Sequence, residues 1–143
     1  MREVVSEIDI SAPPTRVWTV LTDFARFPEW NPFIREIAGE PRLGAKLRVK
    51  MASGSRTFTF RPSLLEVVPP QRLRWLGHLL VPRLFDGEHR FHLEPRGDGT
   101  HFTQAEKFTG LLVPLTGRLL AATHKSFERM NAALKDRAES STQ

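Results

Sequence analysis

Hydrophobic and polar residues alternate along most of this 143-residue chain, first near the N-terminus and then almost continuously over residues 34–109. Alternation with period two is typical of β-strands that bury one face. Turn-forming residues divide the pattern into segments, and Pro62 predicts a bulge or an edge position inside one of them. The predicted strands cover residues 3–10, 34–40, 45–52, 56–67, 72–80, 87–95 and 100–109.

Helical patterns occur at three places. Ser11 followed by Pro13 and Pro14 predicts a helix start, and a short apolar face follows over residues 17–21. Prolines confine residues 24–33 to a second short helix or a set of turns. Near the C-terminus, spacings of three and four residues predict one long helix over 113–138. Its predicted apolar stripe consists of Leu115, Leu119, Thr123, Phe127, Met130 and Leu134.

This order of elements predicts an α+β fold. Six consecutive strands with short connections favour an antiparallel meander, and the first strand makes seven. The long helix has one surface on which to bury its apolar stripe, so we expect a curved sheet wrapped around it. The length predicts one domain over residues 1–143.

Composition narrows the classes of function. The net charge of +5, from 21 basic and 16 acidic residues, is spread along the chain, whereas nucleic-acid binders usually concentrate it. The chain has no cysteine, so disulfides and thiolate chemistry are excluded. The N-terminus lacks the apolar core of a secretory signal, and no apolar run approaches the roughly 20 residues of a membrane span. We expect a cytoplasmic protein with neither nucleic-acid binding nor stable membrane insertion.

No metal or cofactor is expected. His92 and His101 are predicted to lie diagonally on the outer face of the sheet, with Glu94 opposite His101, but a third ligand is poorly placed. No glycine-rich phosphate loop or nucleophile motif is present in the sequence.

The segment EHRFHLEPRGDGTHFTQAEKF, residues 88–108, places polar side chains among the inward-facing ones. Burying the apolar faces of both its strands predicts one register, with His89 opposite Glu106 and Phe91 opposite Gln104. The same register pairs Leu93 with Phe102 and Gly87 with Phe108, and leaves residues 96–99 as a four-residue loop. Extended backward, it places Trp75 beside Phe91 and Gly77 beside His89.

Four segments resemble the START-like (SRPBCC) superfamily with the helix-grip fold, in particular its polyketide cyclase/dehydrase-like branch. They are VWTVLTDFARFPEWNPFI at 17–34, LRWLG at 73–77, FDGEHRFHLEP at 85–95 and FTQAEKFTGLLVP at 102–114. The resemblance implies a cavity between sheet and long helix that binds sterols, lipids, hormones or polyketides.

Three interpretations of His89 and Glu106 stay open at this point. The two side chains could satisfy one another in a wet interior without function, orient a ligand, or transfer protons in catalysis. A cavity with an apolar lining and a few polar groups favours ligand binding.

The sequence LLVP occurs twice, at 79–82 and 111–114. In a meander both copies lie at the same end of the sheet, which predicts an apolar rim. The rim could be a gate for a ligand, a dimer contact, a membrane-touching patch or ordinary loop packing. The resemblance favours the gate. The predicted rim residues are Leu80, Val81, Leu84, Phe85, Leu111, Leu112 and Val113.

Three hypotheses follow. The first is a protein, monomer or homodimer, that binds a small hydrophobic or amphipathic molecule, with Gln104, Glu106 and His89 orienting its polar end. The second is a cyclase or dehydratase with His89 and Glu106 as acid and base, and the third is a self-association module using the rim. The predicted apolar lining consists of Phe60, Trp75, Phe91, Phe102 and Phe108 from the sheet and Leu119, Phe127 and Met130 from the helix.

Overall fold

The computed structural model describes residues 1–78 and 82–140. This part of the chain holds eight strands, three α-helices and two short 3-10 turns. In chain order the elements are β1 (Arg2–Ile10), α1 (Pro14–Thr22), η1 (Phe24–Arg26), α2 (Phe27–Trp30), β2 (Ile34–Ala38), β3 (Arg48–Ser53), β4 (Arg56–Phe60), β5 (Ser63–Val68), β6 (Arg72–His78), β7 (Asp86–Arg96), β8 (Gly99–Thr109), η2 (Val113–Leu115) and α3 (Gly117–Glu139).

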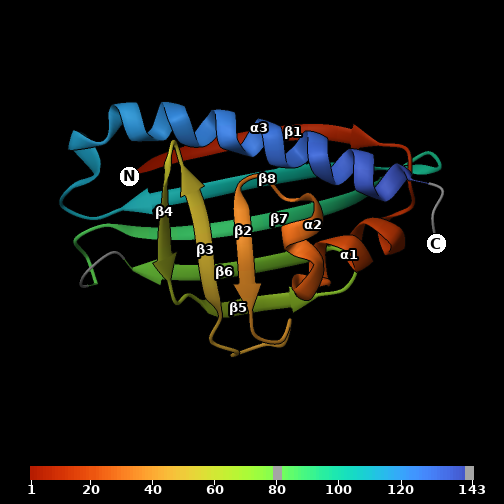
Figure 1. Ribbon diagram of the computed structural model, residues 1–143, viewed down its shortest axis with the longest axis horizontal. Coiled ribbons are helices and arrows are strands. Elements are labelled where there is room, and N and C mark those ends of the chain that lie inside the picture. The colour runs from red at the N-terminus through yellow and green to blue at the C-terminus, as the bar shows by residue number, and fades with distance from the viewer. Residues whose placement is uncertain (79–81, 141–143) are drawn as a thin grey trace.

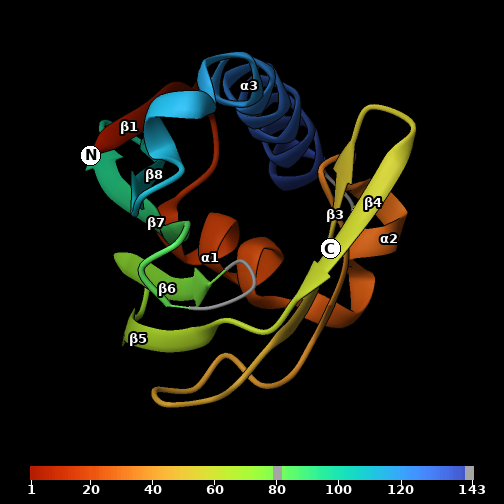
Figure 2. The same cartoon turned by 90° about the vertical axis from the view of Figure 1, so that its left-hand side faces the viewer.

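The strands form two antiparallel sheets around the long helix (Figure 1). The larger sheet has the order β1-β8-β7-β6-β5, and the smaller has the order β2-β3-β4. An isolated bridge between Lys46, just before β3, and Ser63 of β5 lies where the two sheets adjoin. Seen from the end of the molecule in Figure 2, α3, the small sheet and the large sheet surround a common interior. The α+β prediction of a curved antiparallel sheet with a long C-terminal helix is confirmed.

Pro62 explains why eight strands occur instead of seven. The predicted strand 56–67 is in fact two strands, β4 and β5, which belong to different sheets. Proline has no N–H for the ladder, so pairing stops there. Its carbonyl accepts a hydrogen bond from the N–H of Leu47 at 2.8 Å, which fixes the corner between the sheets. The predicted bulge is therefore a crossing from one sheet to the other.

The long helix begins later than its apolar pattern indicates. The segment Val113–Leu115 is a 3-10 turn, and α3 starts at Gly117. The buried face of α3 runs through Leu120, Phe127 and Leu134, seven residues apart, which is two turns of an α-helix. Leu119 falls beside this face and is 40% exposed, and Leu115 is 81% exposed. Both belong to the predicted apolar stripe, and the prediction that they are buried is wrong for both.

The register of the β7–β8 hairpin agrees with its prediction at every pair, including His89 with Glu106 and Phe91 with Gln104. The strands continue to Arg96 and Gly99, so the turn has two residues instead of four, with Gly97 at a φ of 59°. The register predicted for β6 is wrong by two residues, because Trp75 pairs with His89 and Gly77 with Gly87. A shift of two residues keeps every side chain on the same face, so the burial pattern does not detect it.

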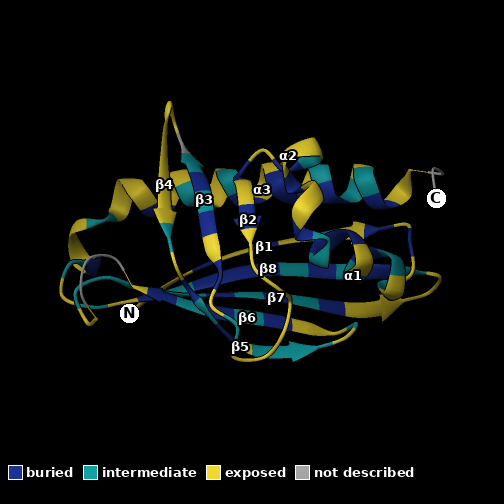
Figure 3. Cartoon of the chain, turned by 60° about the horizontal axis from the view of Figure 1, so that its bottom comes forward, coloured by how far each residue is buried: buried dark blue, intermediate teal, exposed yellow. Residues whose placement is uncertain are grey.

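Burial divides the molecule into an inner and an outer side (Figure 3). The inner sides of the central strands and one face of α3 are buried, while β4 and the outer side of α3 are largely exposed. No helix in the described ranges is long and apolar enough to cross a membrane.

Candidate functional site

A pocket with a cavity volume of about 210 Å³ lies between α3, the β3–β4 hairpin and the adjoining ends of β6, β7 and β8. These elements face one another at the end of the molecule that Figure 2 presents. The pocket is lined mainly by apolar groups, and Phe58, which is 50% exposed, borders it on the solvent side. Its aromatic walls are formed by Phe33, Phe58, Phe60, Phe85 and Phe108.

Five residues predicted from the sequence border this pocket. Phe60, Phe108 and Leu119 supply apolar surface, and Glu106 supplies a carboxyl group. Phe85, predicted as part of the rim, stacks on Phe108 with ring centroids 5.3 Å apart and an angle of 11° between the rings. The pocket therefore joins one end of the predicted lining to part of the predicted rim.

The remaining predicted lining residues lie in the packed core behind the pocket. Trp75 contacts Phe91 with ring centroids 5.4 Å apart, and Phe91 contacts Phe102 at 6.0 Å. Phe127 and Met130 are fully buried on the inner face of α3. These five side chains belong to the hydrophobic core and do not border the pocket.

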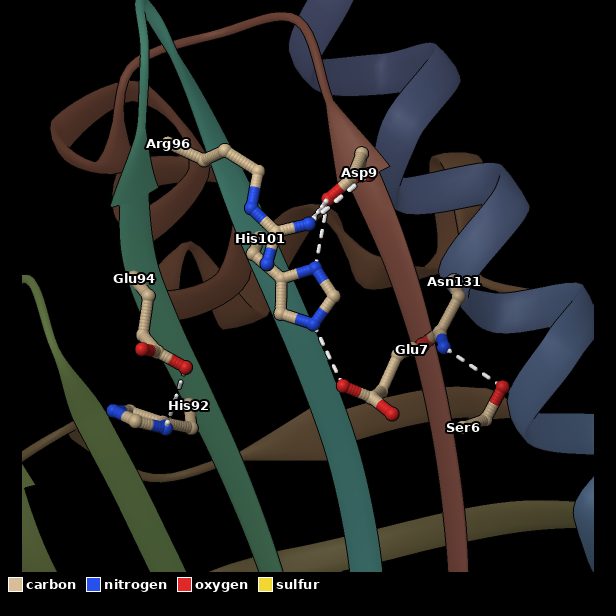
Figure 4. Close-up of polar contacts among 8 residues, drawn as sticks. All are labelled: Ser6, Glu7, Asp9, His92, Glu94, Arg96, His101 and Asn131. Atoms are coloured by element: carbon tan, nitrogen blue, oxygen red, sulfur yellow. Dashed lines mark hydrogen bonds and ion pairs between the residues drawn. The ribbon is translucent and has the colours of Figure 1, made fainter.

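His89 begins a chain of buried hydrogen bonds, which explains why the polar side chains of β7 and β8 can face the interior. Its Nε2 donates to Oε1 of Gln104 at 2.8 Å, and Nε2 of Gln104 donates to Oδ1 of Asn131 at 2.8 Å. Nδ2 of Asn131 then donates to Oγ of Ser6 at 3.1 Å (Figure 4). The chain crosses from β7 through β8 and α3 to β1.

Asn131 and Ser6 are members of this chain that the sequence interpretation missed. A signal for both exists in the sequence. Asn131 directly follows Met130 inside the apolar pattern of the helix, and Ser6 lies in phase with Val4 and Ile8 on the first strand. A polar residue at a buried position requires a partner, so each of these positions predicts a hydrogen bond across the core.

Glu106 connects this chain to the pocket. Its Oε1 lies 3.4 Å from Nδ1 of His89, and its side chain is 11% exposed, whereas the side chain of His89 is 0% exposed. Since Nε2 of His89 donates to Gln104, Nδ1 is the ring nitrogen left to face the carboxyl group. At 3.4 Å the contact between the two groups is not a hydrogen bond, and Nδ1 of His89 is buried without a hydrogen-bond partner among the described residues.

Gly87 provides the space for this carboxyl group. A Cβ atom at position 87 would collide with Oε2 of Glu106. Any larger residue at this point of β7 would force the carboxyl group to move. Gly87 itself borders the pocket, so the absence of a side chain there leaves Glu106 accessible from the pocket.

The two segments of the predicted rim meet, as expected. The N–H groups of Leu111 and Leu112 donate to the carbonyls of Arg83 and Leu84 at 3.1 and 3.0 Å. Leu111 is 81% exposed, but Val113 is 2% exposed and belongs to the core. The predicted rim residues Leu80 and Val81 lie outside the described residues.

The outer face of the sheet carries a second polar cluster around His101 (Figure 4). The ring donates from Nδ1 to Asp9 at 2.7 Å and from Nε2 to Glu7 at 2.6 Å. These hydrogen bonds, first that to Asp9 and then that to Glu7, raise the pKa of His101. The hydrogen bond from His101 in turn lowers the pKa of Asp9. Glu94 lies opposite His101, as predicted, and the described residues contain no group of three side chains arranged for a metal ion.

Comparisons with known proteins agree with this architecture. A family model described as polyketide cyclase/dehydrase and lipid transport matches residues 1–139. A Mesorhizobium loti protein is 23% identical with a TM-score of 0.80, covering 99% of this chain and 100% of its own. A START superfamily protein from Mycobacterium smegmatis is 20% identical with a TM-score of 0.78, covering 96% and 97%.

The Zhui aromatase/cyclase from a Streptomyces species is 15% identical with a TM-score of 0.80, covering 99% of this chain and 96% of its own. At these identities the structural similarities establish the fold alone. Comparison with curated protein sequences gives no significant match.

Proposed function

The chain belongs to the polyketide cyclase/dehydrase and lipid transport family. We propose that it binds a small hydrophobic or amphipathic molecule in the pocket beside the N-terminal half of α3. The observation that carries the proposal is the pocket itself, an apolar cavity of about 210 Å³ with one carboxyl group on its inner wall. Mostly apolar pockets with a few placed polar groups are the usual form of small-molecule sites. On this proposal the whole chain acts as one ligand-binding domain.

The size of the cavity supports a compact ligand. An engineered cavity of about 150 Å³ in another protein takes up benzene, so 210 Å³ suits a molecule with one or two rings or a short chain. The exposed side of Phe58 and Leu119 allows a longer ligand to project toward solvent.

Binding of the neutral dye Nile red tests the proposal. Ala122 lies on α3, borders the pocket and is exposed, so Ala122→Phe should fill the cavity without disturbing the core. We expect this variant to bind Nile red at least about tenfold more weakly, a difference of about 1.4 kcal/mol. Ala132→Phe is the matched control, because Ala132 is exposed on the same helix and does not border the pocket. Equal binding by the two variants would argue against the pocket as the site.

A cyclase or dehydratase is the second candidate, favoured by the pairing of an imidazole with a carboxyl group at 3.4 Å beside the pocket. Only Glu106 of this pair borders the pocket, so a substrate would contact Glu106, with His89 holding or returning its proton. On this candidate, Glu106→Gln abolishes turnover of a polyketide-like substrate and keeps its binding. A modest change in affinity with no turnover by the unaltered protein leaves binding as the function.

Self-association through the rim is the third candidate. The exposed side chains of Leu111 and Leu115 would supply the contact. Sedimentation over a range of protein concentrations tests it, and Leu111→Asp should abolish any concentration-dependent mass. A constant monomer mass rules this candidate out.

A further inference from the structure

From the position of Glu106 we infer that the pocket selects ligands whose buried end donates a hydrogen bond, namely amines, alcohols and phenols, and that it excludes carboxylic acids. The inference rests on the proposed function and specifies the chemical class of its ligand. Glu106 is the acidic residue among those that border the pocket.

The carboxyl group of Glu106 is available to a ligand. Within the described residues its polar contact is Nδ1 of His89, at 3.4 Å to Oε1. The other oxygen, Oε2, lies over Gly87, which also borders the pocket. An ionised carboxylate has about four lone-pair directions, so this group retains acceptor capacity on its pocket side.

As a carboxylate, Glu106 has two oxygens that only accept hydrogen bonds, and Oε2 is the one that lies over Gly87 at the pocket. A ligand group that meets Oε2 therefore has to supply the donor.

Other polar groups at the pocket do not change this preference. His78 is held by Asp86, with 2.7 Å between Nδ1 and Oδ1, and the hydroxyl of Thr123 donates to the carbonyl of Leu119 at 2.8 Å. Ser126 carries a hydroxyl, which both donates and accepts and therefore does not discriminate.

The charge of the lining disfavours acids. No Lys or Arg occurs among the described residues that border the pocket. A ligand carboxylate would therefore enter an apolar site beside Glu106 without a compensating cation, which is unfavourable through both desolvation and repulsion. An ammonium group on a ligand is favoured instead, since it is attracted both by the carboxylate of Glu106 and by the faces of the surrounding phenylalanine rings.

Four ligands on one skeleton test the inference at pH 7: naphthalene, 2-naphthol, 2-naphthylmethylamine and 2-naphthoic acid. Each is measured by displacement of Nile red. We expect the amine and the naphthol to bind at least about tenfold more tightly than naphthoate. The amine and the naphthol each gain a hydrogen bond to Glu106, whereas naphthoate is repelled by its charge. Naphthalene, which has no polar group, should have an affinity between that of naphthoate and those of the two donors.

Glu106→Gln is the matched variant, because it keeps the shape of the side chain and removes the charge. It should reduce the advantage of the amine over naphthoate by about tenfold and leave naphthalene unchanged. If this variant does not fold, the ranking of the four ligands by the unaltered protein decides by itself.

The outcomes separate the inference from the proposed function. Naphthoate binding as tightly as the amine would overturn the inference and leave the pocket as a ligand site. An unchanged ranking in a folded Glu106→Gln protein would overturn the role of Glu106. If neither Nile red nor any of the four ligands binds, the proposed function fails and the inference fails with it.

Discussion

Gly87 and Glu106 lie so close on neighbouring strands that a Cβ atom at position 87 would collide with Oε2 of Glu106. The glycine thus leaves room for the carboxylate of its neighbour. This relationship leads to the first of four predictions.

Gly87→Ala should lower the free energy of unfolding by about 1–3 kcal/mol, because the added Cβ must displace a nearly buried carboxyl group. Urea denaturation measures the effect. Gly77→Ala is the matched control, since Gly77 pairs directly with Gly87 and its Cβ would meet Phe60 at an acceptable 3.4 Å. Equal stability of the two variants would contradict the proposed crowding at Glu106.

Asn131→Ala should lower the free energy of unfolding by about 2–4 kcal/mol, because it leaves Gln104 and Ser6 without their buried partner and opens a small cavity. Ser6→Ala removes one bond and should have an effect of about 1 kcal/mol. In the double variant the two effects should not add, since both remove the same hydrogen bond. Additive effects in denaturant titrations would show that Asn131 and Ser6 are energetically independent.

His101 should make stability depend on pH. Its pKa is raised in the folded protein, so its stabilising contribution is complete below the ordinary value of 6.5 and is lost as the pH rises through the folded value. Asp9 has a lowered pKa, so its contribution is present above the ordinary value of 3.8 and is lost as the pH falls through the folded value.

We therefore expect the thermal midpoint of the unaltered protein, relative to that of His101→Gln, to decrease as the pH rises above the ordinary histidine value of 6.5. His124→Gln serves as control, because the side chain of His124 is 47% exposed on α3 and forms an ion pair with Glu128 on the same helix, at 3.6 Å. A parallel pH profile of the His101→Gln and unaltered proteins would refute the contribution of the His101 cluster.

Leu111 and Val113, two residues apart, should differ strongly in how much the same substitution destabilises the protein. Leu111→Asp exposes a charge where the side chain is already 81% exposed, so its effect on the free energy of unfolding should stay within about 0.5 kcal/mol. Val113→Asp places a carboxyl group at a position that is 2% exposed and should destabilise by more than about 3 kcal/mol. Similar stabilities of the two variants in thermal denaturation would contradict the assignment of Leu111 to the surface and of Val113 to the core.

The sequence allowed prediction of the fold class and of the β7–β8 register, in which a one-residue shift would expose Phe102 and Phe108. It did not allow prediction of the β6–β7 register, since a two-residue shift leaves every face unchanged. The separation into two sheets at Pro62 was also missed, because periodicity continues across the corner.

The extent of the pocket could not be predicted for a related reason. Periodicity shows which side chains point inward, and it assigns both Phe91 and Glu106 to the inner face of the sheet. Whether an inward side chain meets other side chains or an open space depends on where α3 and the β3–β4 hairpin lie, which no local pattern specifies. Phe91 is packed by Trp75 and Phe102, whereas Glu106 meets the pocket.

The hydrogen bond between Asn131 and Gln104 has a mechanical consequence for α3. The C-terminal half of the helix is also held by Arg16, which donates to the carbonyl of Ala138, and by Lys135, which donates to the carbonyl of Asp9. The N-terminal half carries the pocket-facing residues Leu119 and Ala122 and is exposed on most of its surface. The hydrogen bonds thus hold the half of α3 that lies away from the pocket, so we expect a displacement of the N-terminal half to change the pocket wall without breaking the bond between Asn131 and Gln104.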